Sequence, residues 1–211
     1  MQPHGRRPDA LSLAALTGKP ASAGFPLPAQ PRALIPTGAF TKEFLTTIKE
    51  QIPDYAKDIR LNLDGAITRS SLTPADSLGV ALAAAFAAKS KPLIDAFKAA
   101  APEAEGNAAL TAAALMGMNN VWYPFVEMAN DEDLKTQRPE LRMNAYATLG
   151  GVEKKKFEAY ALAASIVGKC HFCVESHYAL LKKEGLTTQQ LRDIGRIAAV
   201  VNAAAQVIAA S

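Results

Sequence analysis

The chain has 211 residues, 49% of them hydrophobic, which is enough for one ordinary domain or two small ones with a sizeable core. Alanine dominates this hydrophobic fraction, and runs of Val, Ile and Thr are scarce, so the composition favours an all-α fold. The formal net charge is only +3, no apolar run approaches the length of a membrane span, and no basic stripe alternates with aromatic residues; we therefore expect a soluble cytoplasmic protein that binds neither membrane nor nucleic acid.

Residues 1–40 differ in composition from the rest of the chain. They hold seven of the thirteen prolines, and their four basic side chains against one acidic side chain account for the whole charge of +3. Such a segment is typical of a disordered extension. Its basic start and the apolar residues 10–17 loosely resemble a signal peptide, but the apolar part is short and diluted by Ser and Thr. We expect a flexible tail ahead of a helical domain over residues 41–211.

Two helices are predicted between Thr41 and Gly65. Thr41 is a candidate N-cap, and the first helix should end before Pro53. Its apolar face repeats at helical spacing and comprises Phe44, Leu45, Ile48 and Ile52. The second helix is expected to begin near Asp54 and to reach a break at Gly65.

A third helix has a clear start signal, because Thr73 is a suitable N-cap and Pro74 fits the first helical position. The Ala-rich residues 77–89 that follow predict a buried helix. Residues 80–90 align without a gap on residues 160–170, and a second Ala-rich helix follows each segment, at 107–123 and at 191–209. The chain therefore predicts two weakly repeated halves, about 41–130 and about 145–211.

The first half carries no chemistry in this alignment. Its counterparts to the polar residues of the second half are apolar or small, and four large side chains in its second helix are interpreted as packing or subunit-contact residues: Met116, Met118, Trp122 and Tyr123. The charged segment 130–144 contains Pro139 and predicts an exposed connector between the halves.

Both cysteines lie in one stretch of the second half, as a Cys170-x-x-Cys173 pair with His177 four residues later. On a helix these side chains share one face, and Gly168 is a plausible break just before them. A helix start stabilises a thiolate, and His177 can take up a thiol proton. Glu158 is about 18 Å away along a straight helix, so it joins the site only if the chain turns back near residues 167–169.

Three interpretations of this pattern remain open on the residues alone. Cys170, Cys173 and His177 can be zinc ligands with Glu158 or a water as the fourth, they can form a redox dithiol, or the cysteines can be buried and inert. A thioredoxin-coupled disulfide oxidoreductase is a further possibility within the redox class.

After the cysteines, the sequence predicts one helix end and one long helix. Gly185 is the expected C′ residue of the cysteine helix, and Thr187 or Thr188 can cap the next one. The apolar positions of residues 191–209 supply a long face for the core.

Glu158, Cys170-x-x-Cys173 and His177 together resemble the active-site pattern of the alkyl hydroperoxidase D family (AhpD), in the carboxymuconolactone decarboxylase superfamily. Segments 54–63, 67–71, 116–121 and 138–144 also resemble family segments in the same order, so the resemblance covers about residues 44–210. One departure is that Phe172 stands where some members carry a histidine. His171, one residue earlier, is rotated by about 100° on a helix and should not inherit that role.

The resemblance implies an antioxidant alkyl hydroperoxide reductase with no bound cofactor or metal. It assigns peroxide attack to Cys173, resolution to Cys170 and a proton relay to Glu158 and His177, although the helix dipole favours Cys170 as the more readily ionised thiol. Cys170, nearer the expected exposed helix start, is the candidate for contact with a partner. The implied partners are a peroxiredoxin, a lipoylated 2-oxoacid dehydrogenase component that supplies dihydrolipoamide, and further copies of the chain in a homotrimer.

Overall fold

The computed structural model describes residues 40–211, and this part of the chain is helical with no strand. The all-α prediction is confirmed for these residues. The predicted tail, residues 1–40, lies outside the described part of the chain except for its last residue. The elements are α1 Phe40–Glu50, η2 Asp54–Ala56, α2 Lys57–Thr68, α3 Pro74–Ala87, α4 Lys91–Ala100, α5 Glu103–Ala129, α6 Glu132–Thr136, α7 Asn144–Ala147, η3 Leu149–Gly151, α8 Lys154–Gly168, α9 His171–Lys183 and α10 Thr188–Ala210.

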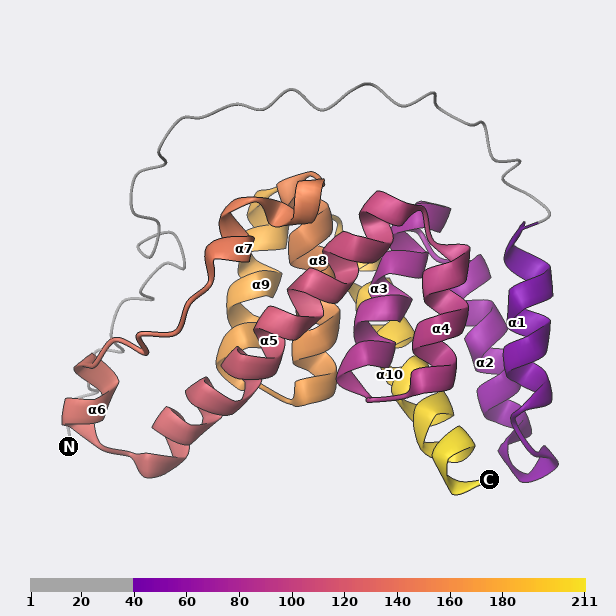
Figure 1. The fold of residues 1–211 in the computed structure, drawn as a ribbon, viewed down its shortest axis with the longest axis horizontal. Helices are drawn as coiled ribbons and strands as arrows, with labels where there is room; N and C mark the ends of the chain where they lie inside the picture. Colours follow the sequence, from indigo (N-terminus) through magenta and orange to yellow (C-terminus); the bar gives the residue numbers. More distant parts are fainter. Residues whose placement is uncertain (1–39) are drawn as a thin grey trace, which may run out of the picture. The chain divides into compact units, whose positions relative to one another are not determined.

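Helices α3 and α8 form the centre of the described bundle (Figure 1). They contact each other, and both α5 and α10 pack against the two of them, while α4 lies against α3 and α9 against α8. Residues 77–85 of α3 and 157–165 of α8 are all buried. Small alanine side chains allow these helices to approach closely, which explains why so Ala-rich a sequence builds a continuous core.

The predicted helix boundaries at Thr73, Gly185 and Thr187 are confirmed. Thr73 accepts a hydrogen bond from the backbone N–H of Asp76 (3.2 Å) ahead of Pro74. Thr187 and Gln190 form a reciprocal capping box at the start of α10. Gly185, with φ of 91°, follows the end of α9 as the expected left-handed residue.

Two predicted boundaries of the N-terminal helices are wrong. Thr41 lies inside α1, which begins at Phe40, and Gly65 lies inside α2, which runs on to Thr68. A helical glycine costs about 1 kcal/mol relative to alanine. Burial of Leu63, Ala66 and Ile67 on the helix that packs against α10 outweighs that local cost.

The turn between α3 and α4 recurs between α8 and α9, 80 residues later. Lys89 and Lys169 are both left-handed, with φ of 59° and 56°. The residue after each donates a backbone hydrogen bond five residues back, from Ser90 to Ala85 (3.1 Å) and from Cys170 to Ser165 (3.3 Å). The aligned segments therefore share one helix-turn-helix geometry. The division of the chain into two halves stays a prediction.

Helix α10 corrects the expectation that no apolar stretch is as long as a membrane span. Within residues 40–211 it is the one helix with that length and apolar character, with a mean hydropathy of 1.3. Its face toward α2, α3 and α8 is buried, including Leu191, Ile194, Ile197 and Val201. The length and hydropathy of α10 therefore match its place as a core helix of the bundle.

Candidate active site

The chain reverses direction between α8 and α9, at the place where the sequence required a turn. Helix α8 ends at Gly168, Lys169 adopts the left-handed conformation, and Cys170 is the N-cap of α9. Gly168 is needed for a contact with α5, because a Cβ atom there would lie 2.9 Å from Cβ of Asn120 and closer still to its amide. That amide donates a hydrogen bond to the Ala164 carbonyl oxygen (3.1 Å).

Cys170 and Cys173 are joined by a disulfide at the first turn of α9. The backbone N–H of Cys173 donates to Sγ of Cys170 (3.3 Å), so this sulfur takes the place of the oxygen in an ordinary N-cap. The same sulfur lies 3.9 Å from the carbonyl oxygen of Asn119 on α5. Helix-start reasoning correctly placed the pair at the N-terminus of a helix.

The expectation that Cys170 is the more accessible sulfur is wrong. Cys170 is 0% exposed and Cys173 is 3% exposed. The N-cap position turns the Cys170 side chain toward α5 instead of toward solvent, because its sulfur caps the helix from the inner side. Exposure therefore does not distinguish the two sulfurs in the disulfide form.

Glu158 of α8 and His177 of α9 form a buried pair beside the disulfide. Oε2 of Glu158 lies 2.6 Å from Nδ1 of His177, and the two side chains are 1% and 2% exposed. Cys173 and His177 are one turn apart on α9 and share a face. The structure thus brings together all four residues selected from the sequence, across the predicted turn near Gly168.

Two further residues complete the surroundings of this pair, and sequence reasoning missed both. The hydroxyl of Tyr146 on α7 donates to Oε1 of Glu158, and Sδ of Met116 on α5 lies 3.2 Å from Nε2 of His177. Burial and the contact with Glu158 raise the pKa of Tyr146 above its ordinary value, so the phenol stays protonated and is a donor. From the sequence, Met116 is predicted to be a packing or subunit-contact residue.

Helix α5 also links the pair to the cysteines. Met116 and Asn119 are three residues apart on α5; the first contacts His177 and the second contacts Cys170. The amide of Asn119 also lies 4.0 Å from the Met116 sulfur. The relay candidates and the disulfide therefore face one strip of α5. The sequence contained one indication that Tyr146 or a similar donor was needed: a buried carboxylate such as Glu158 requires more than one hydrogen-bond partner.

His171 lies outside this constellation, as the rotation on the helix predicted. Its side chain is 85% exposed and its nearest charged partner is Glu127, at 4.0 Å. Phe172 instead stacks on Tyr123, with ring centroids 4.2 Å apart. Neither side chain contacts the Glu158–His177 pair.

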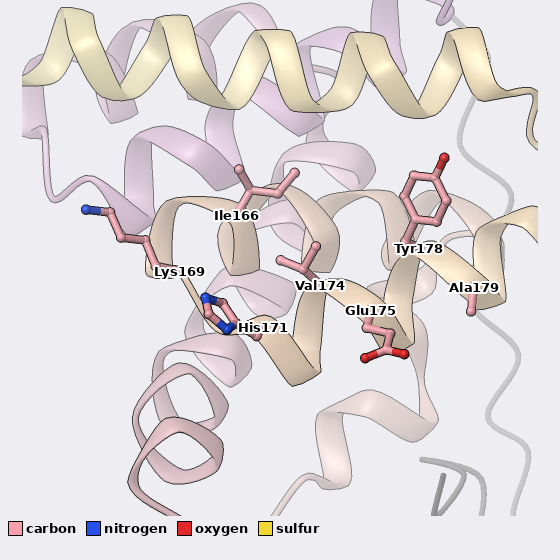
Figure 2. A pocket seen from close by; sticks show the side chains of 7 residues that line it. All are labelled: Ile166, Lys169, His171, Val174, Glu175, Tyr178 and Ala179. Carbon is pink, nitrogen blue, oxygen red and sulfur yellow. The ribbon is translucent and has the colours of Figure 1, made fainter. Parts of the chain in front are cut away.

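A surface pocket of about 640 Å³ lies on the outer side of the α8–α9 turn (Figure 2). Figure 2 shows Lys169 and His171 toward one end and Tyr178 and Ala179 toward the other. The remaining lining residues are Ile166, Val174 and Glu175. None of the four candidate catalytic residues lines this pocket, so it is distinct from the buried disulfide site.

The zinc interpretation requires Cys170, Cys173 and His177 to converge with a fourth ligand. Among residues 40–211, no group of three or more His, Cys, Asp or Glu side chains is arranged to hold a metal ion. The two sulfurs are bonded to each other, and both ring nitrogens of His177 have protein partners. In this arrangement the cysteine sulfurs and the imidazole nitrogens are engaged in protein contacts and not arranged as zinc ligands.

The chain is similar to named proteins over most of its length. Residues 132–211 match the carboxymuconolactone decarboxylase family. The chain is 43% identical over 168 residues to alkyl hydroperoxide reductase AhpD of Rhodospirillum centenum, covering 78% of this chain and 90% of that protein. It is 42% identical over 170 residues to the protein of that name from Maricaulis maris (79% and 98%), and 39% identical over 170 residues to that from Coxiella burnetii (77% and 96%).

Proposed function

The chain belongs to the alkyl hydroperoxide reductase AhpD family, in the carboxymuconolactone decarboxylase superfamily, and from this premise we propose that it is an antioxidant thiol peroxidase and disulfide reductase. Its substrates are organic hydroperoxides, an oxidised peroxiredoxin, or both. The observation that carries the proposal is the buried Glu158–His177 pair next to a disulfide whose two cysteines are the only ones in the chain. Such a site can exchange both electrons and protons.

The catalytic cycle begins with both cysteines reduced. The Cys173 thiolate attacks the O–O bond of the hydroperoxide, which releases an alcohol and leaves Cys173 as a sulfenic acid. The Cys170 thiol then displaces water from that sulfenic acid and forms the disulfide. Glu158 and His177 take the proton from the attacking thiol and supply one to the departing alkoxide.

Two physical arguments distribute the roles of the sulfurs. Cys173 shares a helix face with His177, one turn away, which supports its assignment as the peroxide-attacking thiol. Cys170 occupies the N-cap and accepts a helix N–H, which favours its thiolate as the group released when the disulfide is reduced. A reductant thiolate that attacks Cys173 releases the Cys170 thiolate, so the mixed disulfide forms on Cys173 and Cys170 is the resolving cysteine.

The electron donor in this proposal is a dihydrolipoyl group on a 2-oxoacid dehydrogenase component. One of its thiolates attacks the disulfide and the second closes the lipoyl ring, so two electrons pass to Cys170 and Cys173. Because both sulfurs are buried, a thin dithiol arm is better suited to reach them than the broad surface of a thioredoxin. A peroxiredoxin of the same system is the proposed protein partner, in the cytoplasm.

The proposal includes a homotrimer. An apolar stripe on the C-terminal part of α5 supports self-association, since Val121, Phe125 and Met128 are 70%, 47% and 78% exposed at helical spacing. Figure 1 shows this part of α5 and helix α6 extending beyond α8 and α9. Light scattering of the purified chain measures the mass, and a monomer would remove this part of the proposal.

The reductant experiment tests the function directly. Dihydrolipoamide with its NADH-dependent dehydrogenase should support hydroperoxide-dependent NADH consumption, and thioredoxin with its reductase should be much poorer. The Cys170→Ser/Cys173→Ser variant is the control and should give no turnover. Equal turnover with thioredoxin would identify a thioredoxin-coupled oxidoreductase. Stoichiometric zinc together with peroxide-insensitive thiols would contradict the redox function.

A further inference from the structure

Tyr146 lies between the connector and α8, in a segment that the structure fixes firmly. Gly150, with φ of 60°, presses on α5 so closely that a Cβ atom would lie 2.6 Å from Cα of Ala108. The Tyr146 ring meets Phe157 edge-on, with centroids 5.6 Å apart. The backbone N–H of Tyr146 donates to Met143 (2.9 Å). These contacts hold the phenol of Tyr146 against Phe157 and Glu158 of α8.

The hydroxyl group of Tyr146 and the ring of His177 each contact one oxygen of the Glu158 carboxylate. Oε1 accepts the hydrogen bond of Tyr146, and Oε2 faces Nδ1 of His177 at 2.6 Å. Because burial and Glu158 raise the pKa of Tyr146, the phenol donates this hydrogen bond over the whole working pH range. With both oxygens engaged, the carboxylate cannot rotate without breaking a buried hydrogen bond.

The contact of Nε2 of His177 with Met116 indicates where the protons of the Glu158–His177 pair lie. The sulfur of Met116 is an acceptor only, so its approach to Nε2 at 3.2 Å favours a proton on Nε2. The one remaining proton of the pair then lies between Nδ1 and Oε2. A donor at Oε1 stabilises the carboxylate form of Glu158 and moves this proton toward Nδ1.

We propose that Tyr146 is a positioning residue of the relay: its hydroxyl holds the Glu158 carboxylate so that the shared proton rests on His177, from which the relay supplies it to the departing alkoxide. This role rests on the proposed function, because it presumes that Glu158 and His177 move protons during the cycle. Tyr146 does not touch the sulfurs. It acts through Glu158, and its loss leaves a carboxylate that can take the proton itself.

The proposal is tested with Tyr146→Phe, which keeps the ring and removes the donor. Peroxide-driven disulfide formation should slow about 10- to 100-fold, the range expected for losing one hydrogen bond to a charged group, mainly in kcat with little change in KM. Tyr55→Phe is the matched control, since Tyr55 is 75% exposed, and its rate should equal that of the unmodified chain. Equal rates for Tyr146→Phe and the unmodified chain would overturn the proposal.

A second readout separates positioning from mere support of the fold. ¹⁵N NMR of histidine-labelled protein without substrate reports where the His177 protons lie, and Tyr146→Phe should shift the Nδ1 signal toward that of an unprotonated nitrogen. A slow variant with unchanged His177 signals would make Tyr146 structural and refute the role. Should Tyr146→Phe not fold, 3-fluorotyrosine at position 146 keeps the shape, and its altered phenol must still move the Nδ1 signal.

A Glu158→Gln variant distinguishes the proposed role of Tyr146 from the proposed peroxidase function. In a Glu158→Gln background, Tyr146→Phe should cause no further loss, because Tyr146 acts through Glu158. A full additional loss would overturn the role of Tyr146 while leaving the peroxidase function intact. Failure of the unmodified dithiol to react with either a hydroperoxide or an oxidised peroxiredoxin would instead refute the proposed function, and the NMR result would still stand by itself.

Discussion

Asp193 is a buried carboxylate near the start of α10 that ties this helix to the loop before α3. Its side chain is 1% exposed. Oδ2 accepts hydrogen bonds from the backbone N–H (2.9 Å) and the hydroxyl (2.8 Å) of Ser71, and Oδ1 accepts from Arg192 (3.1 Å) and Arg196 (3.0 Å). We predict that Asp193→Asn destabilises the fold without altering the disulfide site.

The size of this effect follows from these hydrogen bonds. The two bonds from Ser71 lose their charge assistance, worth about 1 kcal/mol each, and the new amide leaves one donor facing another, which costs about 1–3 kcal/mol. The bonds from Arg192 and Arg196 add little, because these side chains are 59% and 45% exposed. The free energy of unfolding should fall by about 3–5 kcal/mol in total. This corresponds to a decrease in Tm of about 6–20 °C.

The same residue gives a pH dependence with a definite sign. Burial alone would raise the pKa of Asp193, but the hydrogen bonds from Ser71 and the two arginines outweigh it and hold the pKa far below the ordinary value of 3.8. A lowered folded-state pKa means that the stabilisation is complete above the ordinary value and is lost as the pH falls toward the folded value. The difference between the unmodified chain and Asp193→Asn should be constant above about pH 5 and shrink in acid.

Urea unfolding from pH 3 to pH 7 measures this difference. The control is Asp95→Asn, because Asp95 is 58% exposed and pairs with Lys91 one helical turn away. This control should change the unfolding free energy by about 0.5 kcal/mol or less. The reasoning fails if Asp193→Asn costs no more than the control, or if its cost is undiminished at pH 3.

Three other substitutions probe the site and its scaffold. Glu158→Gln should slow peroxide reduction by about 10²- to 10⁴-fold, measured by stopped-flow thiol oxidation, with a nearly unchanged Tm; full activity would remove this carboxylate from the relay. Gly168→Ala should destabilise by about 1–3 kcal/mol in urea unfolding because of overpacking against α5, whereas Gly117→Ala, in open space on α5, should be neutral or stabilising. In Cys170→Ser, mass spectrometry after one equivalent of peroxide should find Cys173 as a sulfenic or higher acid; an unreacted thiol there would reverse the roles of the sulfurs.

The features of the fold that the sequence predicted are those governed by local chemistry. Thr73 with Pro74, the capping box at Thr187 and the left-handed Gly185 each satisfy backbone groups within a few residues of themselves. Gly65 shows the limit of this reasoning. Its effect on α2 depends on burial against α10, more than 120 residues later in the chain, and no local pattern contains that information.

The site divides in the same way. The spacing of Cys170, Cys173 and His177 is local to one helix, and the position of Glu158 required only that the chain turn once near Gly168. Tyr146 and Met116 could not be found by spacing, because both reach the pair from other elements. Met116 is 61 residues from His177 in sequence, and its contact exists only because α5 packs against α8 and α9.

The repeated turn shows which part of the site belongs to the scaffold. Lys89 and Ser90 in the first copy repeat the backbone geometry of Lys169 and Cys170 in the second, including the left-handed lysine. Ser90 makes no side-chain cap, yet the turn is the same. The turn therefore does not depend on the disulfide. The cysteines occupy a helix start that the fold provides in both copies.

Glu158 and His177, unlike the cysteines, need contacts that the repeated helix pair does not provide. In the first copy the counterparts of Glu158 and His177 are Leu78 and Phe97, which are 5% and 0% exposed and need only apolar neighbours. Placing a carboxylate and an imidazole at these buried positions would cost several kcal/mol without hydrogen bonds. Their mutual contact satisfies one atom of each, and the remaining oxygen and nitrogen must be satisfied from outside the repeated helix pair. Tyr146 from α7 and a methionine from α5 supply these contacts. A helix pair alone can therefore position the disulfide, whereas the proton-transferring pair depends on the packing of α5 and α7 around it.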